Sequence, residues 1–324
     1  MRLTDEILFE VEDGGIAVVT IDRPQARNAI NSGVIEGLRQ AWQRFAQDDT
    51  LRVAVLTGSG DKAFCAGMDL KQAAATGLRI PPRDMFPILG DAVRLDKPVI
   101  AAVNGAAYAG GFLFAQMCDL CVASDNALFG ITEAKVGRGM PWAAPLAHML
   151  PQRVMMELLL TGAPMTAQRA HDLGYVNAVV PLAELREKAL AMARAIAANA
   201  PLTVRAAREL VYMSSEMGRS AALRAAYPLF DSVYLSEDAQ EGPRAFAEKR
   251  APRWSGRGTP ACARCSASKR RSLPFHTAAT WWSRCPRPVG WVCWAWRAPA
   301  PIGWKRTCAG STRTSAAVRM AWTS

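Results

Sequence analysis

Residues 97–111 read KPVIAAVNGAAYAGG, and this stretch decides the fold. Its first half is an apolar run rich in branched residues. Its second half is a turn of small residues that leads into a helix predicted over 112–117. LRVAVLTG, residues 51–58, is a similar apolar run that ends at Gly58 and predicts a strand buried on both faces. Strands joined by helices in this way are typical of an α/β domain.

The segment before these runs predicts a hairpin and a helix. ILFEVEDGGIAVVTIDRP, residues 7–24, contains two alternating segments around Asp13, Gly14 and Gly15, which is a hairpin signal. Residues 31–47 have the apolar spacing of an amphipathic helix, with Asn31 or Ser32 as its N-cap. Its apolar stripe consists of Val34, Leu38, Ala41, Trp42 and Phe45.

The segment after them predicts two more strands and a helical region. CDLCVASDNALFGI, residues 118–131, predicts two short strands around a turn at Asp125 and Asn126. Further along, apolar residues recur every three to four positions in three predicted helices, which cover 182–199, 201–217 and 219–235. We therefore expect one α/β domain whose last third is helical.

Composition divides the chain into two parts. Of its 324 residues 50% are hydrophobic and 21% are charged, so a large core can be buried. The net charge is +11. Residues 258–324 contain 11 of the 39 Lys and Arg and neither Asp nor Glu, so the 28 basic residues before them balance the 28 acidic ones. The body, residues 1–257, is therefore neutral, and we expect no nucleic-acid partner for it.

Hydropathy and cysteine content indicate the cytoplasm. No apolar run reaches about 18 residues, and the first residues, MRLTDEILFEVEDGG, lack the apolar core of a secretion signal. We therefore expect no membrane association. The body has three scattered cysteines, Cys65, Cys118 and Cys121, which do not form a disulfide framework and fit a reducing compartment.

Residues 258–324, the tail, contain seven of the ten tryptophans and show neither helical nor alternating periodicity. One interpretation is a disordered or frame-shifted segment that is not an evolved domain. The other is a basic, aromatic segment that binds single-stranded nucleic acid. We favour the first. Cys262 and Cys265 predict no metal site, because no second pair follows at a suitable spacing and only His276 is near.

Two small-residue turns are candidates for binding a negatively charged oxygen. Residues 63–70 read AFCAGMDL and residues 104–111 read NGAAYAGG. Small residues let a ligand approach the backbone, and free amides at a helix start can hold an oxyanion. Two such turns can each direct one N–H at the same oxygen, although either turn taken singly is more often only a turn.

Glu133 is the candidate acid/base. It follows the apolar strand in ALFGITEAKVG, residues 127–137. A carboxylate in apolar surroundings has a raised pKa and can transfer protons near neutral pH. The alternative is an acid favoured by the helix dipole in a first turn.

Together these residues resemble the enoyl-CoA hydratase/isomerase (crotonase) superfamily, over about residues 6–257. The matching motifs, in chain order, are IDRPQARNAI (21–30), DKAFCAGMDL (61–70), KPVIAAVNGAAYAGG (97–111), the Cys118-Asp119 dipeptide, ALFGITEAKVG (127–137) and SEDAQEGPRAFAEKRAPRWSGR (236–257). The resemblance implies an α/β fold that is a spiral of ββα turns, with a C-terminal helical trimerisation region over about 182–257. It also implies a homotrimer or homohexamer.

The resemblance also implies the substrate and the residues that hold it. The substrate is an acyl-CoA thioester, whose coenzyme A is part of the substrate, so no separate cofactor and no metal are expected. The backbone N–H groups of Met68 and Gly110 match the family's oxyanion hole, with Glu133 as acid/base. The positions that match or flank the coenzyme A site are Ala66, Arg27, Lys62, Asp69, Phe230 and Lys249, the last two from a neighbouring subunit in some members. Lys62 and Lys249 are equally well explained as solvated surface charges, and Asp69 as a helix-start acid.

One position departs from the pattern of the family's hydratases, which use two glutamates. The first should fall three residues after Gly110, where this chain has Leu113. A single base suffices to move a double bond, so the sequence favours isomerisation of a 3-enoyl-CoA, with hydration of a 2-enoyl-CoA as the alternative. A relative that binds acyl-CoA without catalysis is a third hypothesis. Nearby Met140 and Trp142 either line the acyl pocket or pack in the core.

Overall fold

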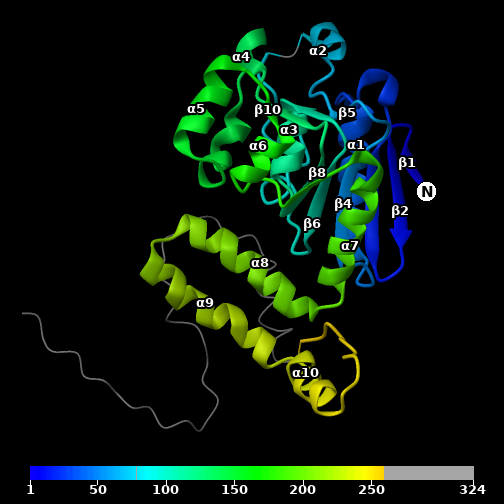
Figure 1. Ribbon diagram of the computed structural model, residues 1–324, viewed down its shortest axis with the longest axis vertical. Coiled ribbons are helices and arrows are strands. Elements are labelled where there is room, and N and C mark those ends of the chain that lie inside the picture. Colours follow the sequence, from blue (N-terminus) through cyan, green and yellow to red (C-terminus); the bar gives the residue numbers. More distant parts are fainter. Residues whose placement is uncertain (78, 259–324) are drawn as a thin grey trace, which may run out of the picture. The chain divides into compact units, whose positions relative to one another are not determined.

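We describe residues 1–77 and 79–258 of a computed structural model, shown in Figure 1. The predictions made for the tail therefore lie outside the described residues, apart from Gly258. Within the described part, the larger sheet has seven strands. Their spatial order is β1 (Arg2–Thr4), β2 (Ile7–Glu12), β3 (Ile16–Ile21), β4 (Val53–Gly58), β6 (Val99–Val103), β8 (Leu120–Ser124) and β11 (Ala178–Val180).

The first three strands are antiparallel and the others are parallel. The predicted hairpin is confirmed, because β2 and β3 pair around Gly14 and Gly15, whose φ values are 83° and 78°. The strand predicted at 51–58 is β4, and its residues are buried apart from the half-buried Thr57.

A smaller sheet lies over the ends of the parallel strands and holds the predicted turns. Its spatial order is β10 (Met165–Thr166), β9 (Leu128–Gly130), β7 (Ala106–Tyr108) and β5 (Ala63–Cys65). A strand of the large sheet, a strand of the small sheet and a helix follow one another three times along the chain. The helices that close these units are α2 (Leu70–Thr76), α3 (Gly110–Gln116) and α4 (Glu133–Val136). This repetition confirms the spiral of ββα turns.

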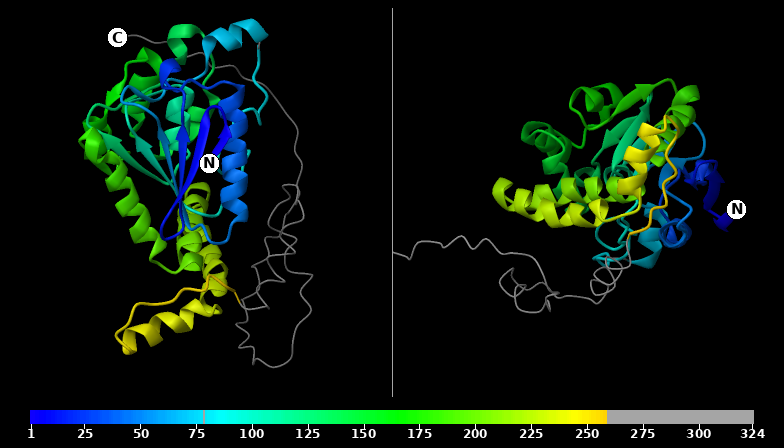
Figure 2. Two further views of the ribbon diagram at one scale, coloured as in Figure 1. Left: turned by 90° about the vertical axis from the view of Figure 1, so that its right-hand side faces the viewer. Right: turned by 90° about the horizontal axis from the view of Figure 1, so that it is seen from below.

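Helices cover both faces of the large sheet. Helix α1 (Ser32–Gln47) packs on one face, and its first turn is capped by Asn31, whose Oδ1 accepts a hydrogen bond from the Val34 N–H at 2.8 Å. Helix α7 (Leu185–Ala197) packs on the other face. The left view of Figure 2 shows α7 in green and α1 in blue with the strands between them. The predicted amphipathic helix at 31–47 is thereby confirmed.

The remaining elements connect the sheets and form the helical C-terminal part. They are the 3₁₀ helices η1 (Pro24–Ala26), η2 (Pro141–His148) and η3 (Leu182–Glu184), and the helices α5 (Gln152–Thr161), α6 (Ala167–Asp172), α8 (Pro201–Glu216), α9 (Arg219–Tyr234) and α10 (Asp238–Ala247). Helices α8 and α9 pack against each other as an antiparallel pair (Figure 1).

The family-like C-terminal motif closes on itself. The Asp238 carboxylate accepts hydrogen bonds from the backbone N–H groups of Ser255 and Gly256, at 2.7 and 3.0 Å. The Trp254 indole donates to the Ala198 carbonyl at 2.7 Å. These bonds fold the residues after α10 back onto α10 and the end of α7.

Asp119 fastens α8 to the sheet. Its Oδ1 accepts hydrogen bonds from Arg208 Nε and from the Tyr212 hydroxyl, both at 2.7 Å. Its Oδ2 accepts one from the Val99 N–H at 2.8 Å, at the start of β6. The side chains of Arg208 and Asp119 are only 11% and 12% exposed. The Cys118-Asp119 motif thus has a structural role.

We expect Asp119→Ala to lower the free energy of unfolding by about 3–5 kcal/mol, because Arg208 would keep a buried charge without its partner. Urea denaturation measures this change. Asp96→Ala is the matched control, since it removes the partner of Arg205 on the same helix at a position that is 66% exposed. The control should cost no more than about 1 kcal/mol. Equal effects of the two substitutions would contradict the role given to Asp119.

Candidate active site

A cavity of about 920 Å³ brings together the three pieces of sequence singled out as chemical. Its wall includes Met68 from the first turn, Gly110 from the second, and Glu133. Other residues of the wall are Ala66, Leu70, Ala109, Leu113, Thr132, Val136, Gly137, Arg138, Gly139, Pro141, Trp142 and several residues between 79 and 92. A cavity of this size accommodates a ligand of ordinary small-molecule dimensions.

The first turn holds its backbone against the second. Gly67 has φ of 91°, and a Cβ there would lie 2.9 Å from the Tyr108 carbonyl oxygen and 3.5 Å from the Gly110 nitrogen. Only glycine permits this approach. The Ile30 N–H donates to the Gly67 carbonyl at 2.8 Å, and the Asp69 N–H donates to the Ile30 carbonyl at 2.9 Å. These two hydrogen bonds do not use the N–H of Met68, the residue between Gly67 and Asp69.

The second turn places Gly110 at the start of α3. A Cβ on Gly111 would lie 1.9 Å from the Cys65 carbonyl oxygen, so α3 packs directly on β5. Ala109, just before the helix, has φ of 52°, which is uncommon for a residue with a Cβ. Its N–H donates to the Gly130 carbonyl at 2.9 Å. Because Gly110 is the first residue of α3, its own N–H has no partner within the helix.

Glu133 lines the cavity and has one carboxylate oxygen bonded and one without a partner in the described part of the chain. The side chain is buried at the start of α4, and Oε1 accepts a hydrogen bond from Trp142 Nε1 at 3.0 Å. Its Oε2 is buried and has no hydrogen-bond partner among the described residues. Burial raises the pKa of this carboxyl above its ordinary value, and the nearby amides and the Trp142 indole offset only part of the rise. An unpartnered oxygen with a raised pKa suits an acid/base.

The cavity wall is apolar at Leu113, the position at which the family resemblance expects the first of the two glutamates of a hydratase. Leu113 lines the cavity and is 1% exposed. Phe112, next to it on α3, packs on the Trp142 ring with a centroid distance of 6.2 Å. The other acids in the wall are Asp84 and Asp91, and both are exposed. Among the described residues, Glu133 is therefore the buried carboxylate of the cavity wall.

The residues expected at the coenzyme A end fall into two groups. Arg27 and Lys62 line a separate hollow of about 150 Å³, next to Asn28 and Asp61. Ala66 lines the large cavity, and its N–H donates to the Arg27 carbonyl at 3.0 Å. This bond joins the backbones beside the two hollows, so these three positions lie close together.

Asp69 caps a helix and is not part of the cavity wall. Its carboxylate accepts hydrogen bonds from the Lys71 and Gln72 N–H groups at 3.2 and 3.3 Å, at the start of α2, and pairs with Arg23 at 3.3 Å. Burial alone would raise the pKa of this carboxyl, but the bonds and the Arg23 guanidinium lower it overall. The structure thus gives Asp69 the alternative role of a helix-start acid, and a contact with substrate stays a prediction.

Phe230 and Lys249 lie apart from the cavity wall in the C-terminal part. Phe230 is half-buried on α9, and Lys249 is exposed just after α10, with φ of 52°. Their contact with coenzyme A stays a prediction. Both bulky residues pack against the core, and Trp142 also lines the cavity, whereas Met140 is not in the cavity wall.

The sequence alone does not indicate two features of the site. The hydrogen bond from Trp142 to Glu133 joins residues nine positions apart through a turn and a 3₁₀ helix, and no periodicity indicates it. The segment between 79 and 92, which supplies Arg79, Arg83 and Phe86 to the wall, has no helical or alternating pattern.

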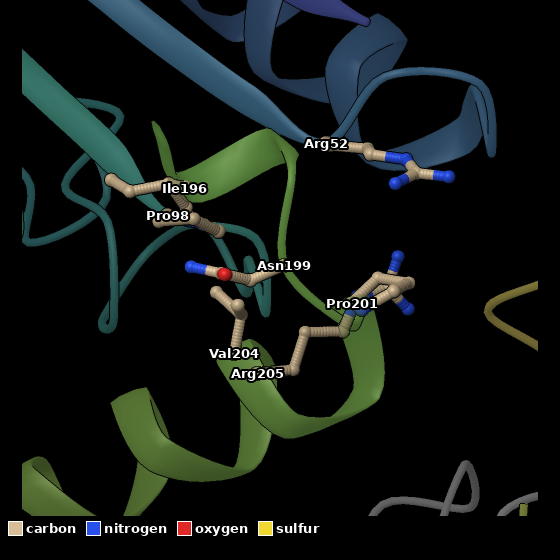
Figure 3. Close-up of a pocket in the computed structure, with 7 residues that line it drawn as sticks. All are labelled: Arg52, Pro98, Ile196, Asn199, Pro201, Val204 and Arg205. Carbon is tan, nitrogen blue, oxygen red and sulfur yellow. The ribbon is translucent and has the colours of Figure 1, made fainter. Parts of the chain in front are cut away.

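A second place, drawn in Figure 3, is too small to be a substrate site. It is a crevice of about 10 Å³ where β6 and the end of α7 meet α8, with Arg52 on one side and Arg205 on the other. This is about the volume that one water needs. Arg52 uses its guanidinium there to donate to the carbonyls of Ala197 and Trp254, at 2.9 and 3.3 Å.

The described residues contain no helix that is long and apolar enough to cross a membrane. Nor does this part of the chain hold a group of three or more His, Cys, Asp or Glu placed to bind a metal ion. Cys65, Cys118 and Cys121 are buried and unpaired.

Comparison with known proteins places the chain in a family. A family model described as enoyl-CoA hydratase/isomerase matches residues 11–257. The chain belongs to this family of enzymes. A carnitinyl-CoA dehydratase of Salmonella typhi is 43% identical over 78% of this chain and 99% of its own length. A carnitinyl-CoA dehydratase of Escherichia coli K12 is 42% identical over the same shares.

Solved structures of the family share the fold. An enoyl-CoA hydratase of Mycobacterium tuberculosis H37Rv is 39% identical, with a TM-score of 0.72 over 78% of this chain and 99% of that one. An enoyl-CoA hydratase of Bacillus anthracis is 30% identical, with a TM-score of 0.73 over 78% and 100%. The names of these four relatives favour the hydration alternative over the isomerisation that Leu113 suggested.

Proposed function

We propose that this enzyme is a hydro-lyase that adds water to 2-enoyl-CoA thioesters and, in reverse, removes water from 3-hydroxyacyl-CoA. One observation carries the proposal: Glu133, whose buried Oε2 has no hydrogen-bond partner among the described residues, lines the same cavity as Met68 and Gly110. The hydratase and dehydratase names of relatives at 30–43% identity support the same reaction. Carnitinyl-CoA is accordingly a substrate to test.

In the proposed reaction, the N–H groups of Met68 and Gly110 bind the thioester oxygen. Glu133 Oε2 takes a proton from water as the water oxygen bonds to C3, and the C2–C3 π electrons move to the thioester oxygen as an enolate. The enolate then collapses, and C2 takes the proton from Glu133. The N–H donors stabilise the negative oxygen more than the starting carbonyl, which lowers the barrier.

Double-bond isomerisation is the second candidate, and Leu113 favours it. A hydratase that uses two carboxylates needs a group at this place that accepts a proton or holds water, and leucine does neither. With Glu133 alone, the base would remove a proton from C2 of a 3-enoyl-CoA and return it at C4. The apolar wall would exclude competing water during this transfer.

The proposal extends to coenzyme A and to assembly. Arg27 and Lys62 are cations beside the backbone of Ala66, where they suit the phosphate groups of the nucleotide. Phe230 and Lys249 lie outside the cavity wall of their own chain, which supports a homotrimer or homohexamer in which a neighbouring subunit supplies them.

The absorbance of the conjugated thioester tests the reaction, with 2-enoyl-CoA and 3-enoyl-CoA supplied separately to the full chain. Hydration predicts that absorbance falls with the 2-enoyl substrate, and that it rises when the corresponding 3-hydroxyacyl-CoA, including carnitinyl-CoA, is supplied. A rise with 3-enoyl-CoA alone would establish the isomerase instead. Silence with all substrates, with acyl-CoA binding retained, would leave the binding protein as the remaining hypothesis.

A further inference from the structure

Trp142 is held in place from two directions. Its ring packs on Phe112 of α3 at an interplanar angle of 55°. Its backbone carbonyl accepts a hydrogen bond from Gln116 Nε2, at 3.1 Å, and Gln116 is a buried residue of the same helix. Because α3 also carries Gly110, one helix fixes both the indole and a proposed oxyanion donor.

The held indole bonds to Glu133, a buried carboxylate of the cavity wall. Trp142 Nε1 lies 3.0 Å from Glu133 Oε1, whereas Oε2 has no partner in the described part of the chain. An indole N–H is a single donor, and here it donates to Oε1. The two oxygens of Glu133 therefore differ in their hydrogen bonding, because Trp142 donates to one of them and not to the other.

We propose that Trp142 is the positioning residue of the acid/base: its indole N–H holds Glu133 through Oε1 so that Oε2 alone faces the reacting carbons. This inference rests on the proposed function of Glu133. The N–H also stabilises the ionised carboxylate, because a hydrogen bond to a charged group is stronger than one between neutral groups.

The bond has a consequence for pH dependence. Burial raises the pKa of Glu133 and the Trp142 N–H lowers it, so losing the N–H must raise the pKa further. The charged or titratable side chains on α4, α5, η2 and the remaining cavity wall are Lys135, Arg138, His148, Arg153, Glu157, Arg79, Arg83, Asp84 and Asp91. Replacing Trp142 alters none of these charged or titratable side chains.

Trp142→Phe tests the proposal, because phenylalanine keeps an aromatic ring against Phe112 and lacks the N–H. We expect kcat to fall about 10- to 100-fold, in line with the loss of one hydrogen bond to a charged group, with little change in KM. The acidic limb of the kcat profile should move to higher pH. Phe86→Leu is the control for lost aromatic wall: it should change KM and leave the pH limb in place.

The proposal would be overturned if Trp142→Phe had the same kcat as the wild type and the acidic limb of its pH profile stayed in place. Should that variant not fold, Gln116→Met removes the anchor of the Trp142 backbone and should move the limb in the same direction by less. If the wild-type chain is inactive on every enoyl-CoA, the proposed function fails. Titration of the Glu133 carboxyl by ¹³C NMR, assigned with Glu133→Gln, then still tests Trp142: an equal pKa with and without the indole would reject its role.

Discussion

Glu133→Gln should lower kcat by about 10²–10⁴-fold on whichever enoyl-CoA the wild-type enzyme converts. The amide cannot accept the proton that the carboxylate takes from water or from carbon. Its oxygen can still accept the hydrogen bond that Trp142 Nε1 now donates to Oε1 at 3.0 Å. Geometry and substrate affinity should therefore be kept while the chemistry is lost. Steady-state kinetics and acyl-CoA binding measure the two effects separately.

The same variant should be more stable than the wild type at neutral pH. Because the folded-state pKa of Glu133 is raised above its ordinary value of 4.5, the unfolded chain releases this proton first as pH rises. The free energy of unfolding of the wild type must then fall, relative to the variant, as pH rises from the ordinary to the raised pKa. Melting temperatures of both proteins at pH 4 and pH 8 measure the difference.

Two outcomes would count against Glu133 as the base. Full activity of Glu133→Gln would mean that another group moves the proton. A loss of activity together with a lower melting temperature at pH 8 would mean that the substitution damages the fold rather than the chemistry. An inactive variant that binds acyl-CoA and melts at the same temperature or higher supports the assignment.

Long, regular elements of this fold can be predicted from the sequence, because the positions that they bury carry apolar residues at regular spacing. Helix α1 buries the stripe that its spacing predicts, and β4 is buried on both faces as its branched apolar run indicates. Strands β5 and β7 could not be predicted in the same way. Each has three residues, and the two strands pair with each other across some 40 positions of the chain. Segments this short show no periodicity, so the sequence indicates turns of small residues there and not strands of a second sheet.

The sequence predicts which residues form the site, but it does not predict how their side chains contact one another. Met68, Gly110 and Glu133 line one cavity because consecutive ββα turns place their ends side by side. Asp69 shows the limit, because a carboxylate at a helix start suits an N-cap as well as it suits a ligand contact, and residue type does not distinguish them. The Trp142–Glu133 bond depends on packing against α3, which one sequence does not reveal.

Gly110→Pro should lower kcat by about 10²–10³-fold, because it removes the backbone N–H proposed to bind the enolate oxygen. Loss of one such donor typically raises the barrier by about 2.7–4 kcal/mol. Gly110 is the first residue of α3 and its N–H has no partner within the helix, so proline removes no helical hydrogen bond. Ala109, however, has φ of 52° and ψ of −119°, outside the extended conformation that a residue before proline adopts. The loss of activity is therefore assigned to the N–H only if circular dichroism and a melting curve show a folded variant.

Gly110→Ala separates the lost N–H from the added bulk. Its Cβ would lie 2.6 Å from Ile30 Cδ1, the end of a flexible side chain that can move, while the N–H stays. We expect the alanine variant to lose only a small part of what the proline variant loses. If both lose the same activity, crowding against Ile30 is the cause and the oxyanion role of Gly110 is wrong. If proline alone is inactive while acyl-CoA still binds, the N–H acts on the transition state, as an enolate mechanism requires.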